Sequence, residues 1–213
     1  MTWRVERFSG HAKDLHQRDP PDPMTRRVWV LTVTGPALVL GSAQPLTDID
    51  EAHAAARGME VARRRSGGGA VLLEPGGSLW VDVLVPRTDP LWHVDIGVAT
   101  HWLGDVWASA LAALGRAADV HKGGLIRTEW SSRVCFAGLG PGEVTDENGR
   151  KLVGISQRRT RAGARFQCVT LAHWDPEDLG ELLSVPAGAL ADLAAVVGAP
   201  LDAVEAAFLA ALP

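Results

Sequence analysis

The sequence predicts a single α+β domain with a mixed, mainly antiparallel sheet flanked by helices. Its 213 residues are close to the usual size of one domain and are enough to bury a substantial core. Short β-branched runs recur up to residue 171, and most of them are joined by turns that contain glycine or proline. Helical periodicity is confined to separate segments, so the order of elements does not fit a β-α-β winding.

The chain begins with a segment that we expect to be an arm without regular structure. Three of the five residues from Asp19 to Pro23 are prolines, which remove backbone donors and disfavour both helix and strand. We therefore assign residues 1–25 to an N-terminal arm and residues 26–213 to a single domain.

The strands are predicted from short apolar runs bounded by turn signals. Gly35-Pro36 separates the first two runs and residues 74–77 separate a later pair, so each pair is expected to form a hairpin. Asn148-Gly149 is the strongest hairpin signal in the chain. The predicted strands cover residues 28–34, 37–40, 59–64, 70–73, 79–85, 134–137, 143–145, 151–156 and 166–171.

The helices are predicted from apolar spacing and capping residues. Thr47 and Asp50 resemble a capping box, Asp89-Pro90 offers an N-cap and an N1 proline for a long amphipathic helix, and Asp175 is a further N-cap. The C-terminal segments are rich in alanine. The predicted helices cover residues 47–56, 90–114, 176–183, 188–197 and 201–212.

Composition excludes several classes of protein. The 21 basic and 25 acidic residues give a formal charge of −4 and 46% of the residues are hydrophobic, which excludes a disordered chain and disfavours a general nucleic-acid binder. All 21 Lys and Arg residues precede residue 166, so any basic site lies before that position. Two cysteines are too few for a disulfide-built secreted domain. The N-terminal segment lacks an apolar run of signal-peptide length, and no stretch reaches about 18 uninterrupted apolar residues. We therefore expect a cytoplasmic protein with no membrane or nucleic-acid partner.

The sequence also lacks the common motifs of metal and nucleotide enzymes. G-x-x-x-x-G-K-[ST], G-x-S-x-G and H-E-x-x-H do not occur, and the 7 histidines show no metal-ligand spacing. We therefore expect no metal held by a set of protein side chains.

A run of three glycines, Gly67 to Gly69, is the first candidate for a ligand site. It follows Arg63-Arg64-Arg65 closely and stands between two predicted strands. Backbone N–H groups without side chains beside them can approach an anionic oxygen closely, and neighbouring arginines would complete an anion site. The alternative is a flexible loop flanked by solvated charge.

Lys151 is the second candidate, because it directly follows a tight turn at the start of a predicted strand. Six basic residues and no acid occur from Asn148 to Arg165. Lysines at such positions are usually solvated, so a surface residue without a specific role is the alternative.

Together the two motifs resemble those of the lipoate-protein ligase A family. Residues 63–71 resemble the family's Arg-Arg-x-Ser-Gly-Gly-Gly-Ala-Val signature, and residues 149–157 resemble its Gly-x-Lys-x-x-Gly-x-x-Gln lysine strand. Trp29 and residues 37–44 are similar to the family's first hairpin. The similarity covers about residues 26–171, and it implies the class II biotin/lipoate ligase-like catalytic fold.

Two departures from the family pattern bear on the function. After the glycine motif the family usually has His-Asp-x-Gly-Asn, where this chain has Leu73-Glu74-Pro75-Gly76-Gly77. The larger ligases also carry a small C-terminal accessory domain, which some members receive as a separate polypeptide and octanoyltransferases lack. We expect no accessory domain in this chain, and a separate accessory polypeptide is one possible partner.

The resemblance implies an ATP-dependent ligase. Such an enzyme activates lipoate or a similar acid such as octanoate with ATP, supplied with Mg²⁺, and transfers the acyl group to a lysine of an acceptor domain. The acceptor would be a lipoyl domain of an acyltransferase E2 subunit or an H-like protein of glycine cleavage. Lys151 would be the catalytic residue. By the same resemblance, substrate and adenylate would contact Arg64, Ser66, Gly67, Gly68, Gly69, Ala70, Val71, Gly41, Gln44 and Gly154.

Two other functions remain open. Cys135, with the nearby sequence Pro141-Gly142-Glu143, resembles a segment of lipoate-ligase-like octanoyltransferases in which the cysteine carries an acyl thioester, so Cys135 is an alternative nucleophile. A strand cysteine is more often a small buried side chain, and we expect Cys168 to lie in the core. The missing His-Asp-x-Gly-Asn pattern suggests the other alternative, a non-catalytic binder of lipoate or a biotin-like ligand.

Overall fold

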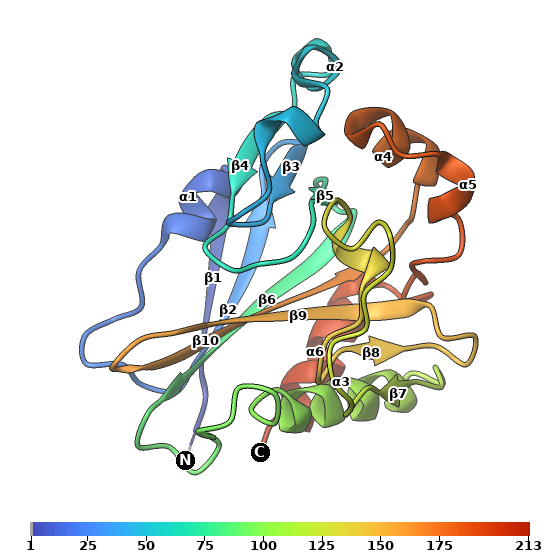
Figure 1. The fold of residues 1–213 in the computed structure, drawn as a ribbon. Coiled ribbons are helices and arrows are strands. Elements are labelled where there is room, and N and C mark those ends of the chain that lie inside the picture. The colour runs from blue at the N-terminus through green and yellow to red at the C-terminus, as the bar shows by residue number, and fades with distance from the viewer. Residues whose placement is uncertain (1) are drawn as a thin grey trace.

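The computed structural model describes residues 2–213 and has the expected α+β fold (Figure 1). The strands are β1 (Arg4–Gly10), β2 (Arg27–Val33), β3 (Ala37–Leu40), β4 (Glu60–Arg63), β5 (Val71–Leu73), β6 (Ser78–Pro86), β7 (Asp119–Val120), β8 (Val144–Thr145), β9 (Lys151–Arg159) and β10 (Gly163–Leu171). The helices are α1 (Ala12–Gln17), α2 (Glu51–Ala56), α3 (His101–Ala113), α4 (Pro176–Leu183), α5 (Ala187–Leu190) and α6 (Leu201–Ala211), with short 3₁₀ turns η1 (Leu46–Asp48) and η2 (Cys135–Ala137).

The strands form two sheets. The larger sheet has the order β1-β2-β6-β10-β9-β8-β7, and the smaller sheet has the order β4-β3-β5. In the larger sheet only β1 and β2 are parallel neighbours within the described chain. The mixed, mainly antiparallel sheet predicted from the sequence is therefore confirmed.

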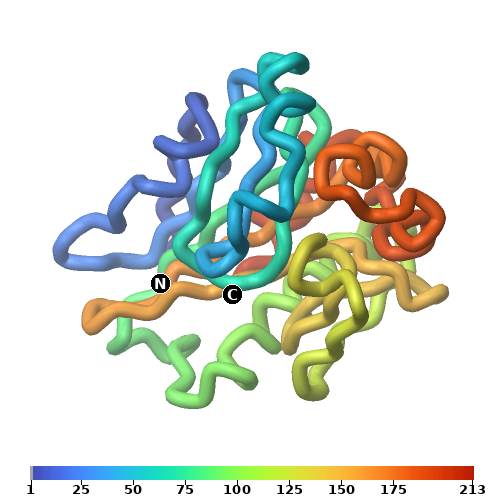
Figure 2. Tube along the Cα trace, turned by 45° about the horizontal axis from the view of Figure 1, so that its top comes forward, coloured from blue at the N-terminus to red at the C-terminus, as the bar shows by residue number. Residues whose placement is uncertain are grey.

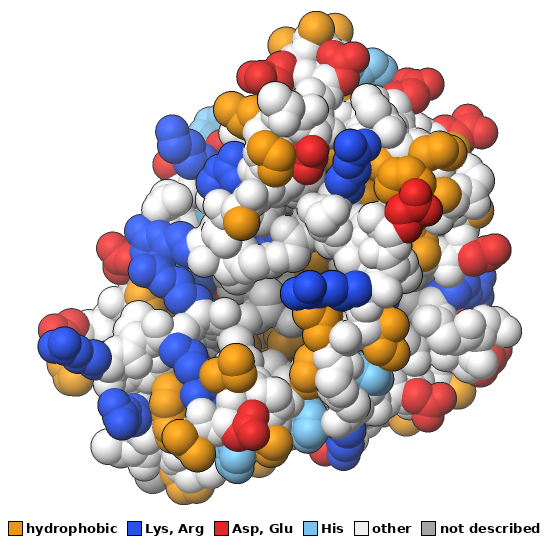
Figure 3. All heavy atoms as spheres, viewed as in Figure 1, with side chains coloured by type: hydrophobic (Ala, Val, Ile, Leu, Met, Phe, Trp, Pro, Cys, Tyr) orange, Lys and Arg blue, Asp and Glu red, His pale blue; other side chains and the backbone are white. Residues whose placement is uncertain are grey.

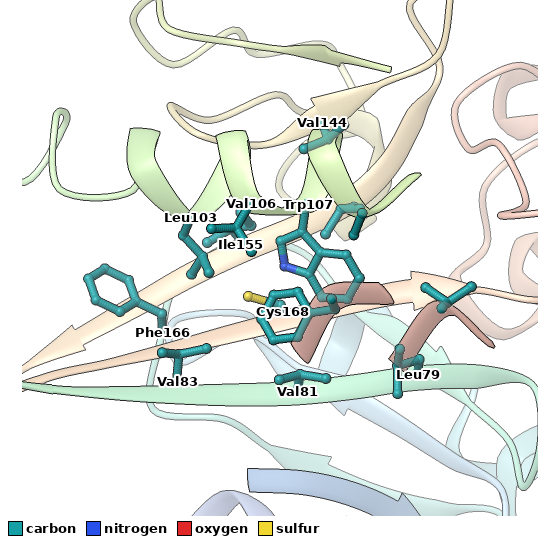
Figure 4. Close-up of a cluster of buried hydrophobic side chains, with 14 of the residues drawn as sticks. Leu79, Val81, Val83, Leu103, Val106, Trp107, Val144, Ile155, Phe166 and Cys168 are labelled. Atoms are coloured by element: carbon teal, nitrogen blue, oxygen red, sulfur yellow. The ribbon is translucent and has the colours of Figure 1, made fainter. Parts of the chain in front are cut away.

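The helices α3 and α6 cover one face of the larger sheet. Trp107 of α3 is fully buried and packs on Phe208 of α6, with the ring centroids 4.3 Å apart. Figure 4 shows Leu103 and Trp107 pointing from α3 toward Val81 and Cys168 on the sheet. This cluster is the main core, and Cys168 lies in it as expected.

The smaller sheet packs against part of the other face of the larger sheet. Val39 and Val71 of the smaller sheet share a buried apolar cluster with Leu31 and Trp80 of the larger one. The loops that follow β3 and β4 extend beyond this cluster toward β9 and β10 (Figure 2). These loops and strands carry most of the residues singled out by the sequence motifs.

The predictions that the strands on either side of Gly35-Pro36, and those on either side of residues 74–77, pair as hairpins are wrong. β2 pairs with β1 and β6, whereas β3 lies in the smaller sheet between β4 and β5. β5 and β6 likewise belong to different sheets, although the chain does turn at residues 74–77. Each connection takes the chain from one sheet to the other, because strand partners are selected by burial across the whole fold rather than by nearness in sequence.

The prediction of an N-terminal arm without regular structure is wrong for residues 4–17. β1 pairs with β2 along its whole length, from Arg4 beside Arg27 to Gly10 beside Val33, and α1 follows. The prolines lie after these elements, in a stretch that has neither helix nor strand. An edge strand that is only partly buried needs few apolar residues, so this segment carries no strong strand signal.

A buried ion pair attaches the end of α1 to the larger sheet. Nε of Arg165 lies 2.6 Å from Oδ2 of Asp82, and both side chains are almost fully buried. The same guanidinium donates to the main-chain oxygens of Leu15 and Arg18, at 3.0 and 2.7 Å. Burial raises the pKa of Asp82, and the positive charge of Arg165 opposes that rise.

Several helix boundaries differ from the predictions. α3 begins at residue 101 instead of 90. Asp89 accepts hydrogen bonds from the N–H of Leu91 at 2.9 Å and from Nη2 of Arg26 at 2.8 Å, but only a turn follows it. The helix predicted for residues 188–197 shortens to α5, and the strand predicted for residues 134–137 contains η2. No helix among residues 2–213 is long and apolar enough to cross a lipid bilayer.

Other local signals are confirmed. The Asp175 carboxylate accepts hydrogen bonds from the N–H groups of Glu177 and Asp178, as an N-cap should. Gly149 has a φ of +77°, which the turn between β8 and β9 requires. Asp50, not Thr47, is the N-cap of α2.

Asp82→Asn should lower the free energy of unfolding by about 3–5 kcal/mol, because it leaves the buried Arg165 charge without its partner. Urea unfolding of the variant against the wild type measures this change. Asp119→Asn, at an exposed position of β7, is the matched control and should change stability by less than about 0.5 kcal/mol. Equal stability of the two variants would contradict the role given to the Arg165–Asp82 pair.

Candidate active site

A cavity of about 1060 Å³ lies beside the packed region between the two sheets. Figure 3 shows the surface hollowed near the middle of this face, with Lys and Arg side chains gathered to one side of the hollow. Its walls come from the loops after β3 and β4, from β5, from β9 and β10, and from residues 125–143. The predicted site residues that line it are Gln44, Arg64, Ser66, Gly67, Gly68, Val71, Cys135, Lys151 and Gly154.

The ammonium group of Lys151 is buried in the wall of this cavity. Its side chain is 3% exposed, and Nζ lies 2.7 Å from Oε2 of Glu143 and 2.9 Å from the main-chain oxygen of Cys135. The centroid of the Phe136 ring is 5.6 Å from Nζ. The alternative of a solvated surface lysine is therefore wrong.

The carboxylate of Glu143 joins three parts of the chain. Besides the Lys151 ammonium, it accepts hydrogen bonds from the N–H of Gly140 at 2.6 Å and from the N–H of Ile155 at 3.0 Å. Such additional hydrogen bonds are what a buried ion pair needs to offset its desolvation. The sequence analysis did not assign Glu143 a role, and its signal was its place in the Pro141-Gly142-Glu143 segment that resembles the octanoyltransferases.

The side chain of Arg64 binds the glycine loop from within. Its Nη2 donates to the main-chain oxygens of Gly67 and Gly69, at 2.7 and 2.8 Å, and its Nη1 donates to that of Val39 at 3.2 Å. The N–H and C=O groups of one trans peptide point in opposite directions, so the N–H of Gly68 points away from Arg64. Among the described residues, the N–H groups of the three glycines have no acceptor. The loop therefore offers backbone donors to an anionic oxygen.

Three of the predicted ligand contacts lie behind the cavity wall. A Cβ atom on Gly41 would come within 1.8 Å of the Gly68 oxygen, and one on Gly69 would come within 2.3 Å of the Val134 nitrogen. Ala70 is fully buried and its main-chain groups bond to residues 133 and 135. These residues allow the glycine loop to pack between β3 and residues 133–135 (Figure 2), so we reassign them from ligand contact to close packing.

A group of polar side chains lies in the same cavity on the face of β9 and β10. Ser66 Oγ is 3.0 Å from Ser156 Oγ and 3.4 Å from Oε1 of Gln167. Nε2 of Gln167 is 3.2 Å from Nδ1 of His16, whose ring packs on Trp80 at an interplanar angle of 32° with the centroids 4.2 Å apart. Only Ser66 was predicted, because His16 belongs to the expected arm and no motif marks the other two.

His16 is a neutral, buried histidine. Burial lowers its pKa to about 3, and the nearby charges of Arg165 and Arg64 act in the same direction. Its Nε2 atom is buried and has no hydrogen-bond partner among the described residues. Gln44 lines another part of the cavity. Its Oε1 atom is also buried and has no hydrogen-bond partner among the described residues.

The two cysteines occupy different environments. Cys135 is half-buried at the cavity, and its main-chain N–H and C=O bond to Ala70 and to Lys151. Cys168 is buried, and this burial raises the pKa of its thiol. Cys135 is thus the better placed of the two to meet a ligand.

The arrangement is suited to an organic anion with an apolar body. A buried cation and the donors of the glycine loop face one cavity, whose other walls include Val71, Trp80 and Val169. Residues 2–213 contain no group of three or more His, Cys, Asp or Glu side chains placed to hold a metal ion.

A family model of the lipoyl protein ligase A/B catalytic domain matches residues 13–205. The chain belongs to this family. The resemblance that residues 63–71 and 149–157 carry in the sequence is therefore confirmed. No protein of a curated set of sequences matches the chain significantly.

Solved structures show the same ligase fold. A lipoate-protein ligase A bound with ATP is 17% identical over 99% of this chain and 84% of its own, with a TM-score of 0.77. A bipartite lipoate protein ligase from Thermoplasma acidophilum, studied with its E2 lipoyl domain, is 17% identical over 99% of this chain and 82% of its own, with a TM-score of 0.75. A biotin protein ligase from Aquifex aeolicus is 10% identical over 98% of this chain and 68% of its own, with a TM-score of 0.50.

Lys151→Ala should destabilise this member of the lipoyl protein ligase A/B family by about 3–5 kcal/mol, because Glu143 would stay buried as an unpaired charge. The double variant Lys151→Met/Glu143→Gln removes both charges and should regain most of that loss. Thermal or urea unfolding measures both effects.

Lys122→Ala is the control for this comparison. Lys122 forms an exposed ion pair with Asp105, so its loss should change stability by less than about 1 kcal/mol. If Lys151→Ala were as stable as Lys122→Ala, the buried pair would not be holding the cavity wall.

Acidification should destabilise the wild type more than a His16→Phe variant. Because the folded pKa of His16, about 3, lies below the usual value near 6.5, the unfolded chain binds a proton in this range that the folded chain does not. The penalty is absent above about pH 6.5 and grows as the pH falls, by up to about 1.4 kcal/mol per pH unit.

Urea unfolding at several pH values between 7 and 4 tests the role of His16. His11→Phe, at an exposed position, should keep the pH dependence of the wild type. Parallel curves for wild type and His16→Phe would mean that His16 is not held neutral.

Proposed function

We propose that this chain is a lipoate-protein ligase-like enzyme, which activates lipoate or a similar acid as acyl-AMP and transfers the acyl group to a lysine of an acceptor domain. One observation carries the proposal: the buried Lys151 ammonium and the free N–H groups of Gly67 and Gly68 belong to one cavity. Both steps of such a reaction build negative charge on oxygens, which a preorganised cation and backbone donors stabilise. Membership of the lipoyl protein ligase A/B family supports the same assignment.

In the first step a carboxylate oxygen of the acid attacks the α-phosphorus of ATP. The bond from that phosphorus to the bridging oxygen of the β-phosphate breaks, and pyrophosphate leaves. Lys151 would contact the carboxylate and an α-phosphate oxygen, and the N–H of Gly68 would donate to a phosphate oxygen. Mg²⁺ would enter with ATP and be held mainly by the phosphates.

In the second step the amine of the acceptor lysine attacks the acyl carbonyl carbon. The bond to the AMP oxygen breaks, the amine loses a proton and an amide forms. Lys151 would again neutralise the charge on the carbonyl oxygen. Val71 and Gln44 line the cavity and are candidates for contact with the acyl chain, whereas Arg64 would act by shaping the glycine loop.

The acceptor proposed for this chain is a lipoyl domain of an acyltransferase E2 subunit or an H-like protein of glycine cleavage. The Thermoplasma acidophilum relative is a bipartite ligase described with an E2 lipoyl domain, which supports a lipoyl acceptor. The same relative makes a separate accessory polypeptide a reasonable second partner to include in assays. We place the enzyme in the cytoplasm, as the sequence composition suggests.

A second candidate is an octanoyltransferase that uses no ATP. It is favoured by the position of Cys135, which lines the cavity. The ammonium of Lys151 donates a hydrogen bond to the main-chain oxygen of Cys135. Its thiolate would attack the carbonyl carbon of an acyl-carrier thioester, the donor thiol would leave, and the enzyme thioester would pass the acyl group to the acceptor amine.

Intact-mass analysis of an acceptor lipoyl domain tests the proposal. After incubation with the protein, MgATP and lipoate or octanoate, with and without an accessory polypeptide, the acceptor should gain one acyl group, and ATP should be required. Lys151→Met/Glu143→Gln, which is expected to stay folded, should lose this activity. If the protein bound the acid but never acylated an acceptor, the proposed enzyme would be wrong and the chain would be a non-catalytic binder.

Cys135→Ser should retain ATP-dependent acyl transfer within a few-fold of the wild type. An adenylate route needs only a residue of similar size at this position, whereas a thioester route needs the thiolate. The opposite result would be an acyl adduct on the wild-type protein that forms from an acyl-carrier donor without ATP, is released by hydroxylamine and is absent from Cys135→Ser. That result would establish the transferase instead.

A further inference from the structure

Large apolar side chains are exposed mainly on two short segments of the chain. Among residues 2–213, seven large hydrophobic residues are exposed, and five of them belong to residues 94–98 and 125–126. Single exposed apolar residues are common on protein surfaces, whereas a group of them indicates a surface that binds a partner. These five residues form the apolar rim: Val94, Ile96, Val98, Leu125 and Ile126.

The apolar rim borders the mouth of the cavity. Ile96 and Leu125 line the cavity, although they are 65% and 56% exposed. A residue that lines the cavity and is also more than half exposed lies where the cavity opens to solvent. The first segment precedes α3 and the second follows β7, so two separate parts of the chain bring apolar residues to the same opening. Figure 3 shows hydrophobic side chains below the hollow on this face.

Two side chains of β9 hold the first of these segments in place. The guanidinium of Arg159 donates to the main-chain oxygens of His93 and Val94, at 2.8 and 2.9 Å. Nε2 of Gln157 donates to the main-chain oxygen of Ile96 at 2.6 Å. The segment is therefore held with its apolar side chains exposed, and it loses little conformational entropy when a partner covers it.

The charges around the mouth are mainly basic. Arg127 follows the rim residue Ile126 and lines the cavity, and Arg158 lies two residues beyond Ser156, a cavity residue on the same face of β9. Neither arginine forms an ion pair with a described acidic residue. Residues 93–98, 125–130 and 157–161 together contain four arginines and two acidic residues. This charge favours a partner with acidic side chains.

We propose that the apolar rim is the docking surface for the acceptor domain, which would present apolar and acidic side chains around its acceptor lysine. The inference rests on the proposed function, because the second step brings the amine of a folded domain to Lys151. A domain that inserts a lysine at this mouth has to cover the rim. Apolar contact with the rim would supply affinity, and the arginines would orient the acidic partner and speed its encounter.

Val94→Glu and Ile126→Glu test this inference, because neither residue lines the cavity and both are exposed. With MgATP, octanoate and a lipoyl domain of an E2 subunit, each variant should raise the KM for the lipoyl domain about tenfold, since it replaces an apolar contact by a charge facing an acidic surface. Val94→Arg should raise that KM less than Val94→Glu does. Val196→Glu, at an exposed apolar position outside the rim and the cavity, is the matched control and should leave it unchanged.

Hydroxylamine in place of the lipoyl domain separates docking from chemistry. Its nitrogen attacks the acyl carbon of the adenylate, AMP leaves and a hydroxamate forms, without any domain having to dock. The wild type and all four variants should form the hydroxamate at the same rate. Slower hydroxamate formation by the rim variants would place their effect in the cavity and overturn docking at the rim.

The remaining outcomes distinguish failure of the inference from failure of the proposed function. If the wild type acylated both acceptors and the two rim variants kept its KM for the lipoyl domain, docking at the rim would be wrong and the proposed function would stand. If the wild type formed neither product, with or without an accessory polypeptide, both would be wrong. A wild-type dimer that Val94→Glu dissociates would mean that a second copy of the chain covers the rim. Equal effects of Val94→Glu and Val94→Arg would contradict an acidic partner.

Discussion

The buried ion pair between Lys151 and Glu143 is the interaction on which the reactive end of the cavity depends. The carboxylate of Glu143 also binds the N–H groups of Gly140 and Ile155, while the ammonium binds the main-chain oxygen of Cys135. The pair thus joins η2, the loop before β8 and the strand β9. Removing two charges from water costs several kcal/mol per ion, and these extra hydrogen bonds offset that cost. The same cation that would meet a carboxylate or phosphate is therefore part of the fold, and a single substitution of Lys151 affects both.

The glycine loop shows a similar division between support and ligand contact. Arg64 would be an obvious anion ligand, yet its guanidinium is used to bind the loop's carbonyl oxygens. That contact turns the N–H of Gly68 outward, so the charge acts through the orientation of a peptide rather than by direct contact. Gly41 and Gly69 are small for a different reason, because other backbone segments occupy the space that a side chain would need. The loop is thereby preorganised, which is how backbone donors stabilise charge without reorganisation during the reaction.

The two ends of the cavity carry different polar side chains. Lys151, paired with Glu143, lies at one end, whereas at the other end burial keeps the His16 imidazole unprotonated. The apolar walls between them include Val71 and Trp80. The position of His16 at one end of the cavity is set by the fold. It relies on the Arg165–Asp82 pair, which holds α1 and therefore His16 against the larger sheet.

The sequence by itself determined the fold class, the glycine loop, the lysine strand and the family, because these depend on local spacing that one segment contains. It could not determine all the strand partners, so two of the three predicted hairpins were wrong: β2 and β3, and β5 and β6, are separated into two sheets by burial across the whole chain, whereas β8 and β9 pair as predicted. It could not show that Lys151 is buried, since the carboxylate and carbonyl that accept its hydrogen bonds come from other segments. It also gave no role to His16, which lies in the segment expected to be an arm. Only the tertiary structure brings that ring onto Trp80 and beside Gln167, more than 60 and 150 positions away in the chain, because burial and pairing act between residues that are distant in sequence.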